Sequence, residues 1–128
     1  MKTILLILFV LCFWKAECQT VYGSISYVEK SLDNVKTNID EYFDESTTWL
    51  NGCSDFYFKN LVLDGSETNV TILIKINGKV VYRKVTNIEG PFTITLKEVN
   101  PLQNGCKIYV IKDKQTILYH EIGISGCN

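Results

Sequence analysis

The chain has one histidine, His120, and two prolines among its 128 residues, and its acidic and basic side chains nearly balance at a formal net charge of −1. A single histidine leaves little room for a hydrolase triad or for a histidine-based metal site. A near-neutral balance gives no reason to expect a nucleic-acid partner, because such proteins present a strongly basic face. After residue 13 no second long apolar run follows, so the sequence predicts no membrane span.

The first eighteen residues have the pattern of a cleaved secretory signal. Lys2 precedes an unbroken apolar run over residues 4–13, and Ala16 and Cys18 stand at the two positions that signal peptidase reads. We therefore expect cleavage after Cys18. The mature chain, residues 19–128, has the length of one domain and is expected to be secreted into an oxidising, extracellular compartment.

The cysteines of the mature chain are odd in number: Cys53, Cys106 and Cys127. In a secreted protein this count predicts one disulfide and a leftover thiol, or a disulfide-linked dimer through the unpaired cysteine. We expect Cys53 to pair with Cys106 or Cys127.

The segment from residue 26 to about residue 50 has the spacing of a long amphipathic helix. Its apolar positions follow steps of four and three: Val28, Leu32, Val35, Ile39, Tyr42 and Trp49. Ser26 and Glu29 fit a capping box at its start, and Gly52 fits a helix end.

Apolar residues alternate with polar ones in the rest of the chain, which is typical of strands. The expected strands cover residues 56–63, 70–76, 79–85, 92–97, 107–112 and 116–122. Asn77-Gly78 predicts a two-residue hairpin turn, with Ile76 opposite Lys79, Ile74 opposite Val81 and Ile72 opposite Arg83. Residues 107–112 and 116–122 are expected to form a second hairpin around Asp113-Lys114. The predicted fold is α+β, with one long N-terminal helix packed on about six antiparallel strands in a curled meander sheet. The alternative is a two-sheet sandwich.

A long helix followed by an antiparallel meander resembles the cystatin architecture in outline. The resemblance covers the arrangement of elements alone, because the hairpin over residues 76–81 lacks the Gln-x-Val-x-Gly pattern of cystatins and the Pro-Trp of their second hairpin is missing. It implies a helix cradled by a sheet and carries no function.

Two features point to a surface that binds a partner. Asn69-Val70-Thr71 is a glycosylation sequon, so its side of the strand should face water. Leu73 and Tyr82 would then form an exposed cross-strand pair flanked by Lys75 and Lys84, unless a second layer covers this face. The basic residues of this hairpin could also touch an anionic membrane or a glycosaminoglycan, although a solvated hairpin is the simpler interpretation.

No catalytic, cofactor-binding or metal-binding residue is predicted. His120 shares its strand face with Leu118 and Ile122 and has no evident nucleophile partner, so we expect it to be non-catalytic. Asp40, Glu41, Asp44 and Glu45 are expected to form a solvated helix face, because the loop pattern of a calcium site is absent.

The sequence thus favours a secreted, non-enzymatic, disulfide-bonded glycoprotein that binds another macromolecule. The expected partner is an extracellular protein, and the expected role is that of an inhibitor, an effector or a defensive or venom-type secretion. The alternative is a carrier of a small apolar ligand, in a cavity lined by Trp49, Phe56, Phe58 and Phe92. A small secreted hydrolase is the third hypothesis.

Overall fold

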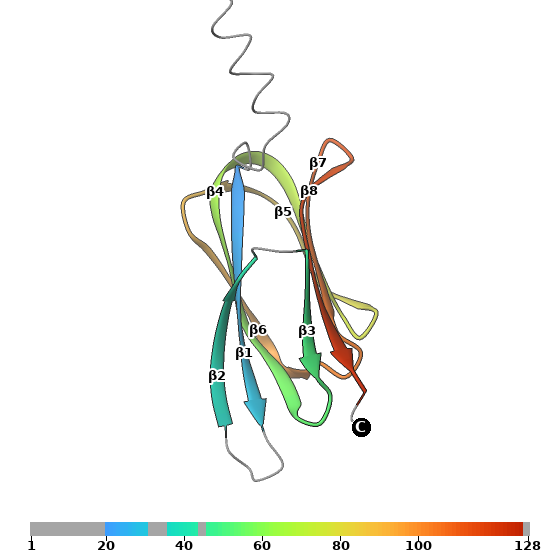
Figure 1. Cartoon of the computed structure of the whole chain (residues 1–128). Helices are drawn as coiled ribbons and strands as arrows, with labels where there is room; N and C mark the ends of the chain where they lie inside the picture. Colours follow the sequence, from blue (N-terminus) through green and yellow to red (C-terminus); the bar gives the residue numbers. More distant parts are fainter. Residues whose placement is uncertain (1–19, 31–35, 44–45, 127–128) are drawn as a thin grey trace, which may run out of the picture.

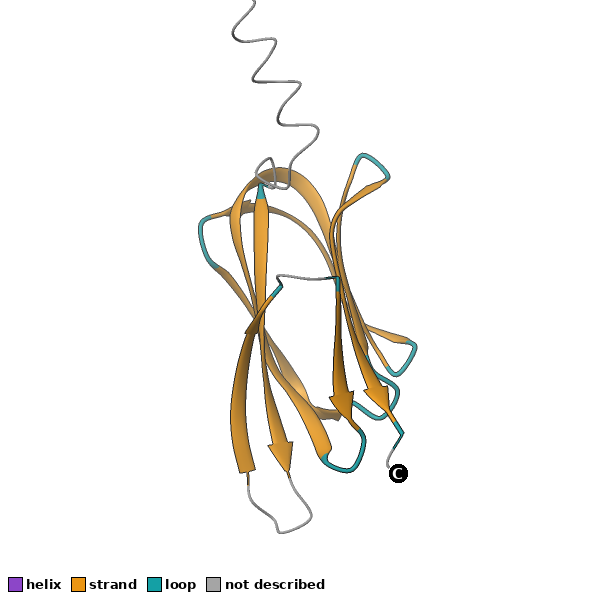
Figure 2. Cartoon of the chain, in the orientation of Figure 1, coloured by secondary structure: helices purple, strands orange, loops and turns teal. Residues whose placement is uncertain are grey.

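The computed structural model describes residues 20–30, 36–43 and 46–126, without the side chains of residues 97–100. Within these ranges the chain forms strands and no helix (Figures 1 and 2). The strands are β1 (Val21–Lys30), β2 (Lys36–Tyr42), β3 (Thr47–Asn51), β4 (Asp55–Ile76), β5 (Lys79–Glu89), β6 (Phe92–Pro101), β7 (Cys106–Lys112) and β8 (Gln115–Ser125). Accordingly, no described segment forms a helix capable of crossing a membrane. The predicted signal, residues 1–18, lies outside the described residues.

One long strand, β4, belongs to two facing layers (Figure 1). Its first half pairs with β1 and β6, and β1 pairs with β2, which makes the first sheet. Its second half pairs with β5 and β7, and β8 and β3 follow β7, which makes the second sheet. The whole is a single curled sheet folded over on itself through β4.

The bend of β4 lies at Gly65, whose φ of 138° is unfavourable for other residues. A β-carbon at this position would lie 1.9 Å from the carbonyl oxygen of Thr20. The Gly65 carbonyl accepts a hydrogen bond of 2.9 Å from Gly90 N–H, where the chain passes from β5 to β6. Gly65 and Gly90 therefore allow β4 to bend and the chain to pass from β5 to β6 at neighbouring positions.

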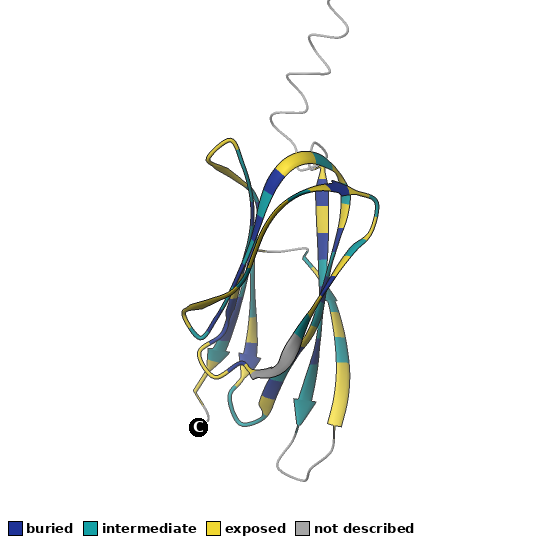
Figure 3. Ribbon diagram, turned by 180° about the vertical axis from the view of Figure 1, so that it is seen from behind, coloured by how far each residue is buried: buried dark blue, intermediate teal, exposed yellow. Residues whose placement is uncertain are grey.

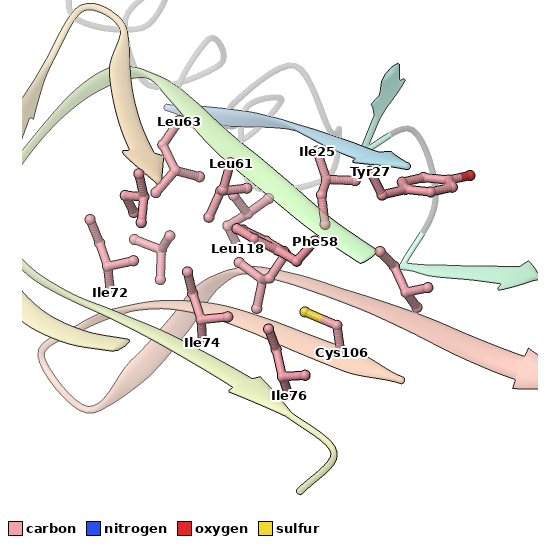
Figure 4. Close-up of a cluster of buried hydrophobic side chains, with 14 of the residues drawn as sticks. Ile25, Tyr27, Phe58, Leu61, Leu63, Ile72, Ile74, Ile76, Cys106 and Leu118 are labelled. Carbon is pink, nitrogen blue, oxygen red and sulfur yellow. The ribbon is translucent and has the colours of Figure 1, made fainter. Parts of the chain in front are cut away.

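The core fills the space between the two layers (Figure 4). Buried side chains alternate with exposed ones along the strands, as Figure 3 shows by colour. In β4 the buried set changes layer at the bend, with Leu61 and Leu63 before it and Ile72, Ile74 and Ile76 after it.

The predicted helix over residues 26–50, and with it the α+β class, is wrong. The described part of this segment forms β1, β2 and β3. In β1 the buried positions are Val21, Gly23, Ile25 and Tyr27, which follow a period of two. Leu50 is the buried residue of β3. The heptad positions Tyr42 and Trp49 are instead exposed, and Leu32 and Val35 lie outside the described residues.

Side chains at the start of the predicted helix instead form hydrogen bonds between β1 and β2. Ser26 donates a hydrogen bond to Asp40 across the β1–β2 pair, and Tyr27 donates one of 2.9 Å to Glu41 of β2. Burial and the nearby Glu41 carboxylate raise the pKa of Tyr27, so its hydroxyl stays protonated at ordinary pH. Without a helix, the resemblance to cystatins does not hold.

The two predicted hairpins are confirmed. Asn77 and Gly78 have φ values of 54° and 79°, and Asp113 and Lys114 have φ values of 51° and 65°, as a two-residue hairpin turn of this type requires. Ile76 pairs with Lys79 as expected. The expected strands 56–63 and 70–76 are two halves of one strand, β4.

The register beyond the first turn was wrong by one residue. A bulge between Ile74 and Lys75 places Ile74 opposite Tyr82 and Ile72 opposite Lys84. The extra residue is Val81, which has no partner in the ladder. Because successive side chains alternate between faces, this single residue moves Tyr82 to the inner face.

The chain also contains a parallel pair that the sequence did not predict. β3 runs parallel to β8, with Thr47 opposite Glu121 and Asn51 opposite Ser125. Gly52 N–H extends this ladder with a 2.9 Å hydrogen bond to the Ser125 carbonyl.

Phe43, which directly follows β2, contacts both layers. Its N–H donates a 2.9 Å hydrogen bond to the Gly23 carbonyl of β1. Its ring lies over Gly23, where a β-carbon would approach within 2.4 Å, and stacks on the ring of His120 at 4.1 Å between centroids. Phe43 therefore connects β1 in the first sheet with β8 in the second.

We predict that Phe43→Ala lowers the free energy of unfolding by about 2 kcal/mol, because it removes a half-buried ring that fills the junction between the layers. Urea denaturation measures the loss. The matched control is Tyr42→Ala, which removes a neighbouring ring that is 78% exposed and should change stability by about 0.5 kcal/mol or less. Equal losses in the two variants would contradict the bridging role.

The described cysteines differ in state. Cys53 is disulfide-bonded, whereas Cys106 is a free thiol and only 2% exposed. Burial raises the pKa of the Cys106 thiol to about 12. A thiol in this position is inaccessible to a second chain, so the structure gives no support to a disulfide-linked dimer through Cys106.

We predict that Cys53 is linked to Cys127. Asn51 is opposite Ser125 in the parallel β3–β8 pair. If that register is extended by two residues on each strand, Cys53 falls opposite position 127, and Cys127 lies outside the described residues. Peptide mapping should find this link and should find Cys106 alkylated only after unfolding. Cys53→Ser should cost about 4 kcal/mol on the chain-entropy estimate. A Cys53–Cys106 peptide would overturn the assignment.

Candidate binding face

The candidate site is the outer face of the second sheet, meaning the side chains of β3, β8, β7, β4 and β5 that point away from the core. They alternate with buried neighbours along each strand. The residues used below are Trp49 on β3, Tyr119 and Glu121 on β8, Lys107 and Tyr109 on β7, Leu73 and Lys75 on β4, and Arg83 on β5.

A row of large side chains crosses this face. Leu73 is opposite both Arg83 and Tyr109, and Tyr109 is opposite Tyr119. The two tyrosine rings lie 5.1 Å apart with a 52° tilt. Tyr119 donates a 2.9 Å hydrogen bond to Glu121, and burial together with this carboxylate raises the pKa of Tyr119 to about 12. The hydroxyl therefore stays protonated at ordinary pH and holds the carboxylate in place.

Trp49 lies on β3, at the edge of the face that is farthest from β5. It is opposite Gly123 in the parallel ladder, and its ring lies directly over that glycine. A β-carbon at Gly123 would fall 2.4 Å from Cζ3 of Trp49, so the ring can rest there only because residue 123 has no side chain. The ring remains 70% exposed. Trp49 is thus a positioned aromatic side chain that the core does not cover.

A basic cleft of about 380 Å³ lies at the end of the face where β4 turns into β5. Lys75 and Lys107 line it and are directly opposite each other on β4 and β7. Glu121, opposite Lys107 on β8, lines its other side. The Lys75 ammonium lies 5.7 Å from the centroid of the Tyr109 ring. The remaining lining residues are Asn77, Gly78, Asn104, Gly105 and Cys106.

The patch predicted from the sequence is divided between two faces. Leu73 and Lys75 lie on the outer face, but Tyr82 lies opposite Ile74 and packs against the core, which raises its pKa by burial. Lys84 lies opposite Ile72, and its ammonium is 5.5 Å from the Phe92 ring. The expected exposed pair of Leu73 and Tyr82 is therefore a wrong pairing, caused by the bulge at Val81.

The other predicted residues are placed as follows. Asn69 is exposed in an irregular stretch of β4, with a φ of 53°, and its N–H donates a 2.8 Å hydrogen bond to Asn87. Its glycosylation stays a prediction. His120 is 1% exposed on the inner face with Leu118 and Ile122, and its Nε2 lies 3.1 Å from the Thr48 hydroxyl.

The residues proposed to line a carrier cavity do not converge. Trp49 is on the outer face, whereas Phe56 and Phe58 are buried in the core and Phe92 is half-buried near Lys84. Phe56 does border a second cleft of about 400 Å³, which Gly52 and Pro101 also line. That cleft also contains the polar residues Ser54, Asp55 and Gln103.

Among the described residues, no three histidine, cysteine or acidic side chains are grouped so that they could hold a metal ion. Asp44 and Glu45 of the predicted acidic cluster lie outside the described residues. Asp40 and Glu41 are both on β2, where they contact Ser26 and Tyr27.

No protein-family model matches the chain, and no curated protein is significantly similar to it in sequence. Functional inference therefore rests on the outer face itself. Sequence reasoning missed Tyr109, Tyr119 and Lys107 as members of this face, although the alternation in the second hairpin carried a signal for all three. Trp49 could not be found in this way, because its segment was interpreted as a helix.

Proposed function

We propose that this protein is secreted and acts, without catalysis, by binding an extracellular protein through the outer face of its second sheet. The observation that carries the proposal is the exposed Trp49 ring, seated on Gly123 at one flank of the face. Tryptophan, tyrosine and arginine are the residues that most often dominate binding energy at protein interfaces. This face presents all three types.

Other residues of this face also suit an interface. Leu73, Tyr109 and Tyr119 form an apolar row over three neighbouring strands, and Arg83 lies at its β5 end. Lys75, Lys107 and Glu121 form a charged row between this apolar row and Trp49. The face therefore combines apolar and polar groups, as protein interfaces do. Because Gly123 and the tyrosine pair fix these rings in advance, little side-chain freedom would be lost when a partner binds.

The alternatives receive less support. A carrier needs an internal apolar cavity, and the space between the layers holds packed side chains from both sheets (Figure 4). A hydrolase would use His120, the single histidine. That ring is buried, stacks on Phe43 and lies beside the Thr48 hydroxyl, with only 1% of its surface exposed, so a substrate would have no path to it.

We predict that Trp49→Ala weakens partner binding by about tenfold or more, as loss of an interface hot spot does. The test screens the mature chain against a panel of purified extracellular domains and repeats each positive titration with the variant. Trp49 is the only tryptophan after residue 18, so its fluorescence in the wild type should shift to the blue when a partner covers it.

The matched control for this titration is Tyr42→Ala, which removes an exposed aromatic ring from β2 of the first sheet. It should leave the affinity unchanged. A partner whose affinity responds to Tyr42→Ala and not to Trp49→Ala would place the interface on the first sheet and overturn the proposal.

We predict further that the secreted protein begins at Gln19 and carries an N-linked glycan on Asn69, because the sequon asparagine is exposed. Intact-mass measurement before and after enzymatic glycan removal checks both points. Asn69→Gln should remove the mass difference without preventing secretion. A mature chain that retains Cys18, or an unmodified Asn69 in protein from a eukaryotic host, would contradict the respective prediction.

A further inference from the structure

The basic cleft is formed around a pair of opposed lysines. Lys75 and Lys107 are directly opposite on adjacent antiparallel strands, a position in which β-carbons are about 5 Å apart and like charges destabilise a sheet. The ion pair formed among the described residues joins Lys112 to Glu67, at a different position on the sheet. Neither lysine of the cleft takes part in an ion pair there, so their repulsion is not offset by a salt bridge.

The cleft walls are held by a network of hydrogen bonds around Asn77. Its side-chain amide donates a 2.9 Å hydrogen bond to the Pro101 carbonyl, and its side-chain oxygen accepts one of 2.7 Å from Asn104 N–H. Its own N–H donates to the Gly105 carbonyl at 3.0 Å. These bonds fix the β4–β5 turn against the loop before β7, so the cleft is formed before any ligand arrives.

We propose that this cleft binds a sulfated sugar of an extracellular glycan, with the sulfate ester between the ammonium groups of Lys75 and Lys107. An oxyanion at this point would neutralise two charges that repel each other in the free protein. The cleft is large enough for more than a bare anion, at about 380 Å³. The cleft lies within the outer face and shares Lys75 and Lys107 with the proposed protein interface, but the glycan proposal does not rest on that interface.

The groups around the cleft favour a sugar over other anions. The Tyr109 ring does not line the cleft but borders it at Lys75, whose ammonium lies over the ring. It would contact the part of a sugar that extends past Lys75. Glu121 is the one carboxylate in the lining, and its hydrogen bond from Tyr119 keeps it at the β8 side. There it can accept hydrogen bonds from sugar hydroxyls, which a lipid phosphate does not supply. A recessed cleft also fits a saccharide better than a flat bilayer.

The experiment uses the mature chain and a size-defined heparin oligosaccharide as probe. Binding is followed by calorimetry and by chemical shifts of backbone amides around Lys75, Lys107 and Gly105. Lys75→Gln with Lys107→Gln should weaken binding by about tenfold or more. Since the substitutions remove a repulsion, the melting temperature should stay the same or rise. Chemically desulfated probe should not bind.

The chain provides a matched control in a second opposed lysine pair. Lys30 and Lys36 face each other on β1 and β2 of the first sheet, and neither lines the basic cleft. Lys30→Gln with Lys36→Gln makes the same change in net charge and should leave heparin binding within about twofold. Equal losses in the two double variants would reduce the effect to general electrostatic attraction and overturn the site.

Two further outcomes also decide the proposal. Binding to vesicles containing phosphatidylserine with no binding to heparin would identify a membrane surface instead and reject the glycan site. Binding to heparin that survives Lys75→Gln with Lys107→Gln would place the glycan elsewhere. None of these measurements involves a protein partner, so a failure of the glycan site leaves the Trp49 interface untouched, and the reverse also holds.

Discussion

The structure depends on a single strand that serves two layers. β4 runs without a break from Asp55 to Ile76 and bends at Gly65, so both sheets share one continuous backbone. Every other strand pairs with one half of β4 or is connected to that half through neighbouring strands. The apolar residues on the two halves then face each other across the core, which makes hydrophobic burial and strand pairing mutually dependent. A side chain at Gly65 would collide with the Thr20 carbonyl and disturb the pairing of β1 with β4 at the bend.

The same arrangement determines what the outer face can display. A sheet that covers its core with one face leaves the other to solvent, and the alternation of side chains distributes residues between the two. In the second sheet the outward positions include Trp49, Tyr109 and Tyr119, which are large aromatic residues. Most of the Trp49 ring is exposed and contributes no buried apolar surface to the core. A ring placed in this way is better explained by contact with another molecule than by the stability of the fold.

The sequence predicted the hairpins better than it predicted the faces. Asn77-Gly78 and Asp113-Lys114 identified both turns, because the left-handed backbone that each turn needs suits these residues. In both hairpins, however, the returning strand carries an extra residue soon after the turn, Val81 in one and Ile117 in the other. Each bulge reverses the facing of the residues that follow, and no local pattern in the sequence announces it. Of the predicted patch, Leu73 and Lys75 therefore lie on the outer face, whereas Tyr82 and Lys84 lie opposite the inward residues Ile74 and Ile72.

The helix was predicted from the spacing of apolar residues, and that spacing has another cause. Steps of three and four arise when apolar residues of two separate strands are read as one series, as with Val28 on β1 and Ile39 on β2. The alternation from Val21 to Tyr27 was the local signal for a strand, but it is only a few residues long. The parallel pairing of β3 with β8 could not be predicted from the sequence, because it joins segments far apart in the chain and leaves no short-range pattern.

That parallel pair has a consequence for how the protein is made. β3 is synthesised well before its partner β8, which is the last of the described strands. The second sheet can be completed only after Ser125 has been synthesised, so β3 waits for its partner while the strands between them are made. Contacts between such distant segments also make folding slow. During that interval β3 and its tryptophan have no strand to pair with, and the growing chain depends on its surroundings to keep that edge from joining another molecule.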